Sequence, residues 1–321
     1  EAHDLRTYVA RSKDDGKTWD TEGTIYPGTS DRCTSDSARL TLAEDDSLVV
    51  FMIRQDRKRK DEGLTNPETQ GYVEQELIIM KSYDRGRTWT EPKIFTPPLK
   101  GPCFELCCPI IPLSSGKWII PTSTWQDWDG YCPNGLKMVA FASYDKGNSW
   151  PDYSDVMVNF EDEITFWESK IVEMKDGRLL AVAWAYDRKN KRDLPNHYAL
   201  SEDGGKTFKT PLSTGLCGQT LTPLVLSDGR ILNVYRRMDK QGLWAVVSRI
   251  DGEKWVNEEE LCLWGQGANK LVETGDNMSK NFNVLKFGAP SLVNMGDGTV
   301  FAAFWAVEDC VSNVRWYKIK I

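Results

Sequence analysis

The chain has 321 residues, of which 40% are hydrophobic and 27% are charged, and its formal net charge is −7. These values are typical of a globular protein with a sizeable core, and the acidic balance argues against a nucleic-acid surface, whose phosphates need concentrated Lys and Arg. No apolar stretch approaches the roughly 20 residues that span a bilayer, and the N-terminus does not read as a signal peptide, so we expect no membrane partner.

The first predicted element, residues 5–27, contains the phrase Ser-x-Asp-x-Gly-x-Thr-Trp. The Asp carboxylate can accept backbone N–H groups of its own turn, Gly takes the left-handed conformation, and the aromatic residue packs between neighbouring sheets. The phrase therefore predicts a folding device and indicates almost nothing about catalysis. Its copies are Ser12–Trp19, Ser82–Trp89, Ser143–Trp150 with Ser for Thr, Ser201–Phe208, and a degenerate Ser248–Trp255 in which Asp251 is displaced by one residue.

A second element alternates with this phrase and consists of an apolar strand, a tight turn and another apolar strand. Asp-Gly between β-rich runs signals a hairpin, because Gly accepts the positive φ that such turns require. We expect each hairpin to be the inner half of a four-stranded antiparallel blade, with the phrase turning the outer half. The hairpins are residues 40–51 around Asp46, 110–120 around Gly116, 171–182 around Asp176-Gly177, 224–234 around Asp228-Gly229, and 292–303 around Asp297-Gly298.

The five phrases resemble the Asp-boxes of the sialidase superfamily, and the likeness covers nearly the whole chain. The resemblance implies an all-β fold: a single β-propeller domain over residues 1–321, built from four-stranded antiparallel blades. Five blades would result if the two chain ends joined in one blade. We favour six blades with an incomplete first one, because residues 313–321 already look like a third strand and would duplicate residues 5–11.

In a propeller, residues just before each innermost strand and just after the second strand line the central pocket. Carboxylates, guanidiniums and indoles gathered there suit a sugar, since indoles cover C–H surfaces and Arg grips a carboxylate with two hydrogen bonds. The first set is Asp36, Glu105, Glu168, Gln219 and Gly288. The second set is Arg54 with Asp56, Trp125 with Asp127, Trp184 with Asp187, Arg236 with Arg237, and Trp305 with Glu308.

The segment from Trp167-Glu168 to Asp176-Gly177 resembles the sialidase segment whose glutamate activates a nucleophilic tyrosine. The alternative interpretation is a Glu that caps a strand or bridges to a neighbouring blade. Other family features are absent: Trp184 replaces an expected arginine, the tyrosine position falls at or near Ala289, and the Phe-Arg-Ile-Pro segment is missing. A third arginine has no clear match, although Arg236 and Arg237 lie nearby. The tyrosine mechanism is therefore not expected.

Without the tyrosine, the hypothesis is a glycosidase that uses two carboxyl groups. One carboxyl is protonated and acts as the acid, and the other is ionised and acts as base or nucleophile. Glu168 is the first catalytic candidate, and its partner would be Glu105, Asp36 or Asp127. The substrate-binding candidates are Arg54, Trp125, Asp127, Trp184, Asp187, Gln219, Arg236, Arg237 and Trp305. Trp125, Trp184 and Trp305 fit sugar stacking and packing between blades equally well.

The leading hypothesis is an exo-acting glycoside hydrolase that acts on a terminal sugar of a glycan or oligosaccharide, acidic sugars included. A non-catalytic carbohydrate-binding propeller is the alternative, and an exo-α-sialidase comes third. No cofactor is implied, and no metal is expected, because no loop has calcium spacing and Cys103, Cys107, Cys108 and Cys132 have no His partners.

The eight cysteines form no Cys-x-x-Cys pair, so we expect reduced, mostly buried thiols and a cytoplasmic location, with secretion as the alternative. The basic run Arg57–Lys60 is predicted to be a solvated loop, because Asp61 and Glu62 follow it. It belongs to the longest predicted insertion, residues 54–74.

Overall fold

The computed structural model describes residues 4–59, 62–159, 163–267, 271–272 and 284–321. The described residues form 22 β-strands joined by turns and loops. They include no helix with the length and apolar character needed to cross a bilayer. The chain divides into two compact units, one of Glu1–Gly135 with Ala140–Tyr153 and the other of Leu136–Val139 with Ser154–Ile321.

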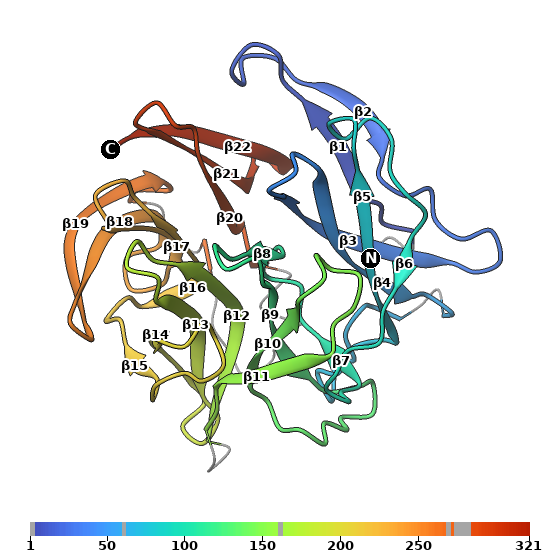
Figure 1. Ribbon diagram of the computed structural model, residues 1–321, viewed down its shortest axis with the longest axis horizontal. Helices are drawn as coiled ribbons and strands as arrows, with labels where there is room; N and C mark the ends of the chain where they lie inside the picture. Colours follow the sequence, from blue (N-terminus) through green and yellow to red (C-terminus); the bar gives the residue numbers. More distant parts are fainter. Residues whose placement is uncertain (1–3, 60–61, 160–162, 268–270, 273–283) are drawn as a thin grey trace. The chain divides into compact units, whose positions relative to one another are not determined.

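The first unit contains a two-stranded sheet, β1-β2, and a four-stranded sheet in the order β3-β4-β5-β6 (Figure 1). A third sheet has the order β11-β10-β9-β7, with β8 also paired to β9, and the division between the units falls within β10 and β11. The strands are β1 Tyr8–Arg11, β2 Asp20–Thr24, β3 Thr34–Leu42, β4 Leu48–Asp56, β5 Gln75–Ser82, β6 Lys93–Ile94, β7 Cys103–Phe104, β8 Ile111–Pro112, β9 Trp118–Trp125, β10 Met138–Ser143 and β11 Asp152–Met157.

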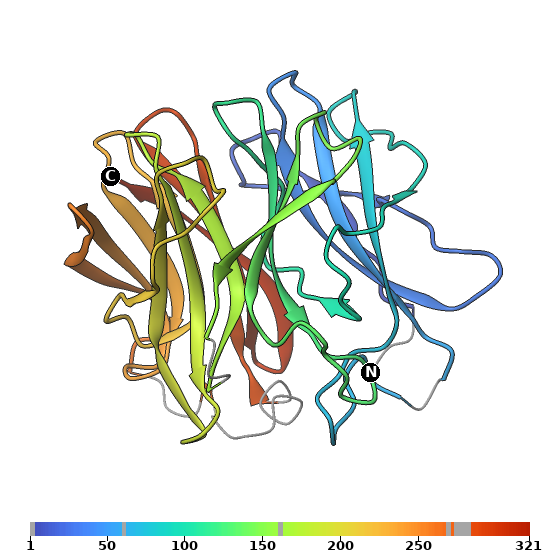
Figure 2. The ribbon, with the colours of Figure 1, turned by 60° about the horizontal axis from the view of Figure 1, so that its bottom comes forward.

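The second unit contains sheets in the orders β12-β13-β14-β15, β16-β17-β18-β19 and β20-β21-β22. Figure 2 shows the long strands β12 to β14 running side by side. The strands are β12 Ile164–Glu173, β13 Leu179–Asp187, β14 Arg192–Ser201, β15 Leu212–Ser213, β16 Gly218–Val225, β17 Ile231–Arg237, β18 Gly242–Asp251, β19 Lys254–Trp264, β20 Phe287–Asn294, β21 Thr299–Glu308 and β22 Val311–Lys320.

These sheets are the repeated antiparallel blades that the sequence predicts. Five sheets have three or more strands, and each of the five predicted hairpins lies at or next to the start of its sheet. The predicted third strand at residues 313–321 is present as β22, and residues 5–27 hold the separate pair β1-β2. The all-β blade organisation is therefore confirmed.

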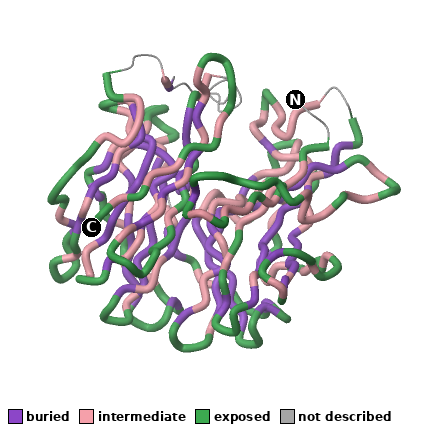
Figure 3. Tube along the Cα trace, turned by 90° about the horizontal axis from the view of Figure 1, so that it is seen from above, coloured by how far each residue is buried: buried purple, intermediate pink, exposed green. Residues whose placement is uncertain are grey.

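Apolar side chains fill the space between neighbouring sheets of the second unit. Leu180 and Val182 of β13 pack in one cluster with Leu221 of β16 and Ile231 of β17. Alternate residues of a strand face opposite sides of its sheet, so a central strand such as β13 is apolar on both faces and buried almost throughout. Figure 3 shows buried and exposed stretches alternating along the chain.

Four copies of the repeated phrase form the same hydrogen-bond network. At Asp145, the hydroxyl of Ser143 donates to Oδ1 at 2.9 Å and the backbone N–H of Ser149 donates to Oδ1 at 2.8 Å. The Ser149 hydroxyl donates to Oδ2 at 2.7 Å, and the Gly147 N–H donates to the Ser143 hydroxyl at 2.8 Å. The same contacts occur around Asp14, Asp84 and Asp203.

The degenerate fifth copy replaces this network. Its Ser248 donates to Asn257 Oδ1 at 2.8 Å, and the Trp255 indole donates to the same oxygen at 2.7 Å. Asp251 instead pairs with Arg249 at 2.9 Å. Asn257 thus supplies the acceptor that the displaced Asp cannot, and Trp255 stays buried between sheets.

Cysteine burial differs from the expectation. Only Cys103 and Cys108 of the eight cysteines are buried, and Cys33 and Cys310 are exposed. The prediction of mostly buried thiols is therefore wrong, because most cysteines lie in turns and strand ends instead of in the apolar stretches of the strands.

The Asp carboxylates of the repeated turn phrase make the free energy of unfolding depend on pH. Hydrogen bonds from the Ser149 hydroxyl and N–H lower the pKa of Asp145 to about 2, and those from Thr18 lower the pKa of Asp14 to about 2. A depressed folded-state pKa contributes stability above the unfolded value of about 3.9, and this contribution is lost as pH falls through the folded value. We therefore expect Asp145→Ala to cost about 1 kcal/mol at pH 7, because its hydrogen bonds are charge-assisted but close to solvent.

The cost of Asp145→Ala should shrink as pH falls from about 4 to about 2, which urea unfolding at several pH values would measure. The control is Asp20→Ala, since the Asp20 side chain is 75% exposed. A cost for Asp145→Ala that is the same at pH 7 and pH 2 would contradict the assignment.

Candidate functional site

The innermost strands of the second unit are interrupted by three equivalent β-bulges. Two residues of β12, β16 and β20 oppose one residue of the second strand, after the pairs Trp167–Trp184, Gln219–Arg236 and Gly288–Trp305. The first bulged residues are Glu168, Thr220 and Ala289, with φ of 54°, 56° and 49°. Positive φ is costly for non-glycine residues, and such strain concentrates at functional sites.

These bulges correct the predicted register. Asp36, Glu168, Gln219 and Gly288 lie inside the innermost strands and not before them. For Glu168, Gln219 and Gly288 the reason is the bulge, which lets the strand extend further toward its N-terminal end. β3 instead pairs with β4 without interruption from Thr34, so Asp36 lies within a regular strand. The equivalent of Glu168 is Thr220 in β16, one residue after the predicted Gln219. In β20 the equivalent is Ala289, one residue after the predicted Gly288. In the second strands, Trp184, Arg236 and Trp305 are equivalent to one another.

Glu168 reaches from its own sheet to the next one. Its carboxylate accepts a hydrogen bond from the backbone N–H of Thr220, so it joins the bulge of β12 to the bulge of β16. The side chain is only partly buried. Its charge acts on two further groups, since it raises the pKa of both Arg236 and Asp193. Glu168 is therefore partly exposed to solvent and interacts with the Arg236 cation and with the Asp193 carboxyl.

Arg236 is a buried cation that donates to neutral acceptors. The residue is 4% exposed, its Nε donates to the Phe287 carbonyl at 2.9 Å and its Nη1 donates to Gln219 Oε1 at 2.8 Å. No carboxylate of the described residues forms an ion pair with it. Burial lowers the pKa of Arg236, and the charge of Glu168 opposes that shift. An anion brought to this guanidinium would relieve the cost of burying its charge.

The absence of a side chain at Gly288 leaves space for the Arg236 guanidinium. A Cβ at this position would lie 1.9 Å from Arg236 Nη2, and the φ of 153° also disfavours a side chain. Trp305 is paired with Gly288 and is half-buried, so its side chain lies on the same face of the sheet. Within the described residues its indole has neither a hydrogen-bond acceptor nor a ring contact. Trp305 is thus available to stack on a sugar.

Trp184 has a different role from Trp305. Its indole donates to Asp193 Oδ1 at 2.7 Å, and its ring meets Trp167 edge to face at 4.6 Å between centroids. Tyr186 stacks on Trp167 with ring centroids 5.7 Å apart. Burial raises the pKa of Asp193, the Trp184 hydrogen bond lowers it, and the Glu168 charge raises it, for a net increase. Asp193 is a carboxyl that the sequence reasoning missed.

Two other predicted residues of this unit have structural partners. Asp187 caps the turn between β13 and β14 by accepting hydrogen bonds from the backbone and side chain of Asn190 at 2.9 and 2.8 Å. Arg237 donates to Asp239 at 2.8 Å and to Glu260 at 2.7 Å, and lies over the Trp244 ring. Because neighbours in a strand face opposite sides, only Arg236 of the two arginines lies beside Gln219.

In the first unit, the candidate Arg54 is paired with a carboxylate. Arg54 donates to Glu76 at 2.6 Å and to the Tyr26 hydroxyl at 3.2 Å, and Arg32 binds the same Glu76 at 2.5 Å. Burial would raise the pKa of Glu76, but the hydrogen bonds from Arg54 and Arg32 outweigh it and lower that pKa. The charge of Arg54 is therefore neutralised within its own sheet.

Asp36 of β3 binds residues 6 and 7, near the N-terminus. Its Oδ1 accepts the backbone N–H of Thr7 at 2.9 Å, and its Oδ2 lies 3.6 Å from Arg6. The residue is 6% exposed, which leaves little of it for a substrate.

Three other candidates lie around β7 and β9. Glu105 follows β7 and is half-buried, with its N–H donating to Ser123 O at 3.1 Å. The Trp125 indole donates to Gln70 O at 2.8 Å. Asp127 caps its own turn by accepting the N–H of Tyr131 at 2.9 Å. Trp125 and Asp127 thus hold loops in place.

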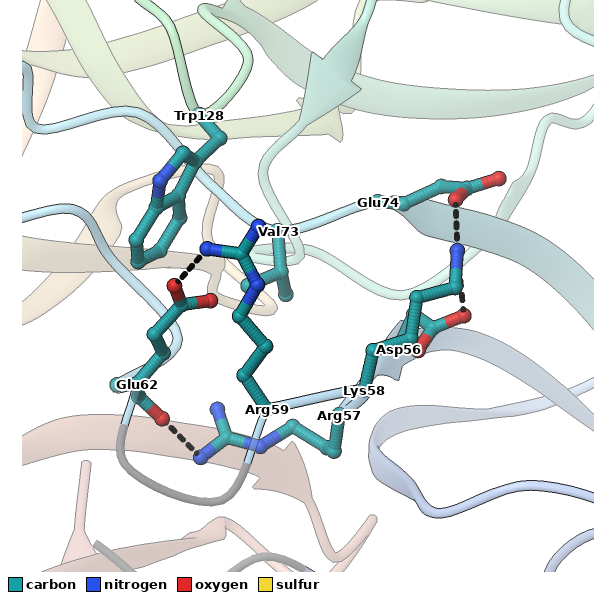
Figure 4. A pocket seen from close by; sticks show the side chains of 9 residues that line it. Asp56, Arg57, Lys58, Arg59, Glu62, Val73, Glu74 and Trp128 are labelled. Atoms are coloured by element: carbon teal, nitrogen blue, oxygen red, sulfur yellow. Dashed lines mark hydrogen bonds and ion pairs between the residues drawn. The ribbon is translucent and has the colours of Figure 1, made fainter.

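The long loop between β4 and β5 lines a pocket with Trp128 (Figure 4). Lys58 lies 3.4 Å from Asp56 and 3.0 Å from Glu74, and Arg59 pairs with Glu62. Lys58 and Arg59 are exposed, as predicted for a solvated loop. Arg57 corrects that prediction: it is 3% exposed and donates to the Glu62 carbonyl at 2.9 Å. Lys60 lies outside the described residues.

No group of three or more His, Cys, Asp or Glu side chains in the described part of the chain is arranged to hold a metal ion.

Known proteins resemble this chain in structure and not in sequence. No family model and no curated protein matches it. A Dyadobacter fermentans protein of unknown function is 21% identical, with a TM-score of 0.72 over 98% of this chain and 83% of that one. The intramolecular trans-sialidase of Ruminococcus gnavus is 14% identical, with a TM-score of 0.70 over 99% and 88%. The chain has a sialidase-like β-propeller fold.

Carbohydrate enzymes outside the sialidases share this propeller. The α-L-arabinanase of Penicillium chrysogenum is 15% identical, with a TM-score of 0.64 over 99% of this chain and 86% of that one. Trp184, where the sequence resemblance expects an arginine, is paired with Trp167. Ala289, at or near the expected tyrosine position, lies at the bulge of β20. The comparisons show that the fold is shared with sialidases.

Proposed function

We propose that this propeller is an exo-acting glycoside hydrolase that acts on a terminal acidic sugar of a glycan or oligosaccharide. The observation that carries the proposal is the buried Arg236 guanidinium, which has no carboxylate partner among the described residues and lies near Glu168. A substrate carboxylate would complete that pair with charge-assisted hydrogen bonds, which are stronger than neutral ones.

The neighbouring residues suit the other parts of a sugar. Trp305 offers an aromatic face on the side of its sheet where Gly288 meets Arg236. Gln219 holds one nitrogen of the guanidinium and so fixes its orientation. Glu168 supplies a carboxylate that can accept a proton during glycoside hydrolysis. Anchoring by charge at one end and stacking at the other favours a terminal residue over an internal one.

The binding-module alternative depends on an aromatic rim, and the structure weakens that rim. The indole N–H groups of Trp125 and Trp184 already have acceptors, and the rings of both pack against other aromatic rings. Only Trp305 of the three predicted indoles is available for stacking.

We also propose that the pair β1-β2 is an incomplete blade, so that the propeller has six blades in total.

The decisive experiment is a panel of aryl glycosides with the wild-type protein. It should contain acidic sugars, a sialoside and a glucuronide, and neutral ones, an arabinoside and a galactoside. We expect turnover of an acidic glycoside at least about tenfold faster than of any neutral one, since losing a charged hydrogen bond costs about 1.5–3 kcal/mol. Faster turnover of a neutral glycoside would overturn the acidic substrate. Saturable binding of an acidic sugar without turnover would support the binding module.

A further inference from the structure

The second unit contains a second carboxyl, Asp193, on which the charge of Glu168 acts. Trp167 precedes Glu168 in β12, its ring touches the Trp184 ring, and the Trp184 indole binds Asp193. The chain of contacts runs across three adjacent strands, β12, β13 and β14. Asp193 is paired with Tyr186, which is paired in turn with Thr165, so these side chains share one face of the sheet.

Asp193 is in surroundings that favour its neutral form. It is partly buried beside the aromatic rings of Trp184 and Tyr186, and the negative charge of Glu168 acts on it. The charge of Asp193 in turn raises the pKa of Cys217, on the segment before β16. The groups that act on the pKa of Asp193 are Glu168 from β12 and Trp184 from β13, and neither is a cation.

Glu168 has different neighbours. A backbone N–H donates to its carboxylate, and the Arg236 cation lies near it. Acid–base catalysis at a glycosidic bond uses two carboxyls in contrasting surroundings. Here one carboxyl lies beside aromatic rings, and the other lies beside a cation and a backbone N–H.

We propose that Asp193 is the general acid that works opposite Glu168, an assignment that rests on the proposed hydrolase function. The Asp193 carboxyl donates its proton to the glycosidic oxygen as the bond from that oxygen to the anomeric carbon breaks. Water adds to the anomeric carbon, and Glu168 accepts the proton that the water loses. One glycoside and one water give a reducing sugar and an alcohol, and proton exchange with solvent restores both carboxyls.

The first arm of the test measures protonation without activity. The Trp184 indole 15N–1H signal, assigned with Trp184→Phe, should report the titration of its acceptor. We expect a midpoint well above the value of about 3.9 for an ordinary aspartate, a lower midpoint in Glu168→Gln, and no titration in Asp193→Asn. A midpoint at or below the ordinary value would overturn the proposal.

The second arm compares leaving groups. Asp193→Asn should lower kcat/KM by about 10²-fold or more for a substrate with a poor alkyl leaving group, and by less than about tenfold for an activated aryl one. Trp184→Phe removes a donor to the carboxylate, so the basic limb of the pH profile should move to higher pH. The matched control is Asp176→Asn, in the turn between β12 and β13, where Asp176 pairs with Arg178.

The outcomes separate the two proposals. Equal losses for both leaving groups in Asp193→Asn, with turnover still abolished by Glu168→Gln, would overturn the role of Asp193 alone. Absence of wild-type turnover on every glycoside would overturn both the hydrolase and the acid assignment. A retained titration shift with selective loss on poor leaving groups supports Asp193 as the acid.

Discussion

Replacing Glu168 by Gln is expected to lower kcat/KM of the acidic glycoside by about 10²- to 10⁴-fold, the range for loss of a general acid or base. Gln has the same shape and keeps an oxygen that can accept the Thr220 N–H. It removes the negative charge and the ability to take up a proton. The unfolding free energy should therefore change little while the chemistry is lost, as steady-state kinetics and urea unfolding would measure.

The same substitution distinguishes catalysis from a bridging role. If Glu168 only ties β12 to β16, Gln preserves the tie and turnover stays near the wild-type level. The matched control is Glu173→Gln, at the other end of β12, where Glu173 is paired with Leu179. Unchanged turnover in Glu168→Gln would remove Glu168 from the mechanism.

The architecture could be predicted because its signals are local. Each turn phrase satisfies its own Asp within a few residues, and each Asp-Gly or Gly turn sets its own hairpin. Glu168 lies at a fixed spacing before the turn at Gly177, but its place at a bulge inside β12 does not follow from that spacing. Local hydrogen bonds and turn chemistry are readable in a single sequence.

The positive-φ bulges and the charged partners of the site residues could not be predicted from local sequence. Thr220 and Ala289 carry positive φ without being glycine, so nothing in the sequence marks the bulges. Asp193 lies in a charged run that looks like a solvent-exposed turn, and its surroundings arise only when β13 and β14 pair. Arg54 and Arg236 looked alike, yet Glu76 neutralises one and no described carboxylate neutralises the other.

Gly288→Ala tests whether Arg236 must remain in place. The new Cβ would collide with the guanidinium and displace it, although its charge and length are kept. Gly298→Ala is the matched control, because Gly298 has φ of 82° in the turn between β20 and β21 and a Cβ there meets no atom within 4 Å. Gly298→Ala should lose stability from backbone strain alone, and Gly288→Ala should lose more because its Cβ also displaces a buried side chain. Only Gly288→Ala should raise KM for the acidic glycoside, which kinetics beside thermal unfolding would show.

Arg236→Met should lower kcat/KM for the acidic glycoside by about 10- to 150-fold, the equivalent of one charged hydrogen bond of about 1.5–3 kcal/mol. Met fills a similar volume, and replacing a buried charge by an apolar side chain is often tolerated by the fold. The control is Arg249→Met in the same sheet, since Arg249 is 44% exposed and pairs with Asp251. Loss on acidic and neutral glycosides alike would mean that Arg236 supports the fold of the pocket, whereas selective loss on acidic ones would make it the carboxylate anchor.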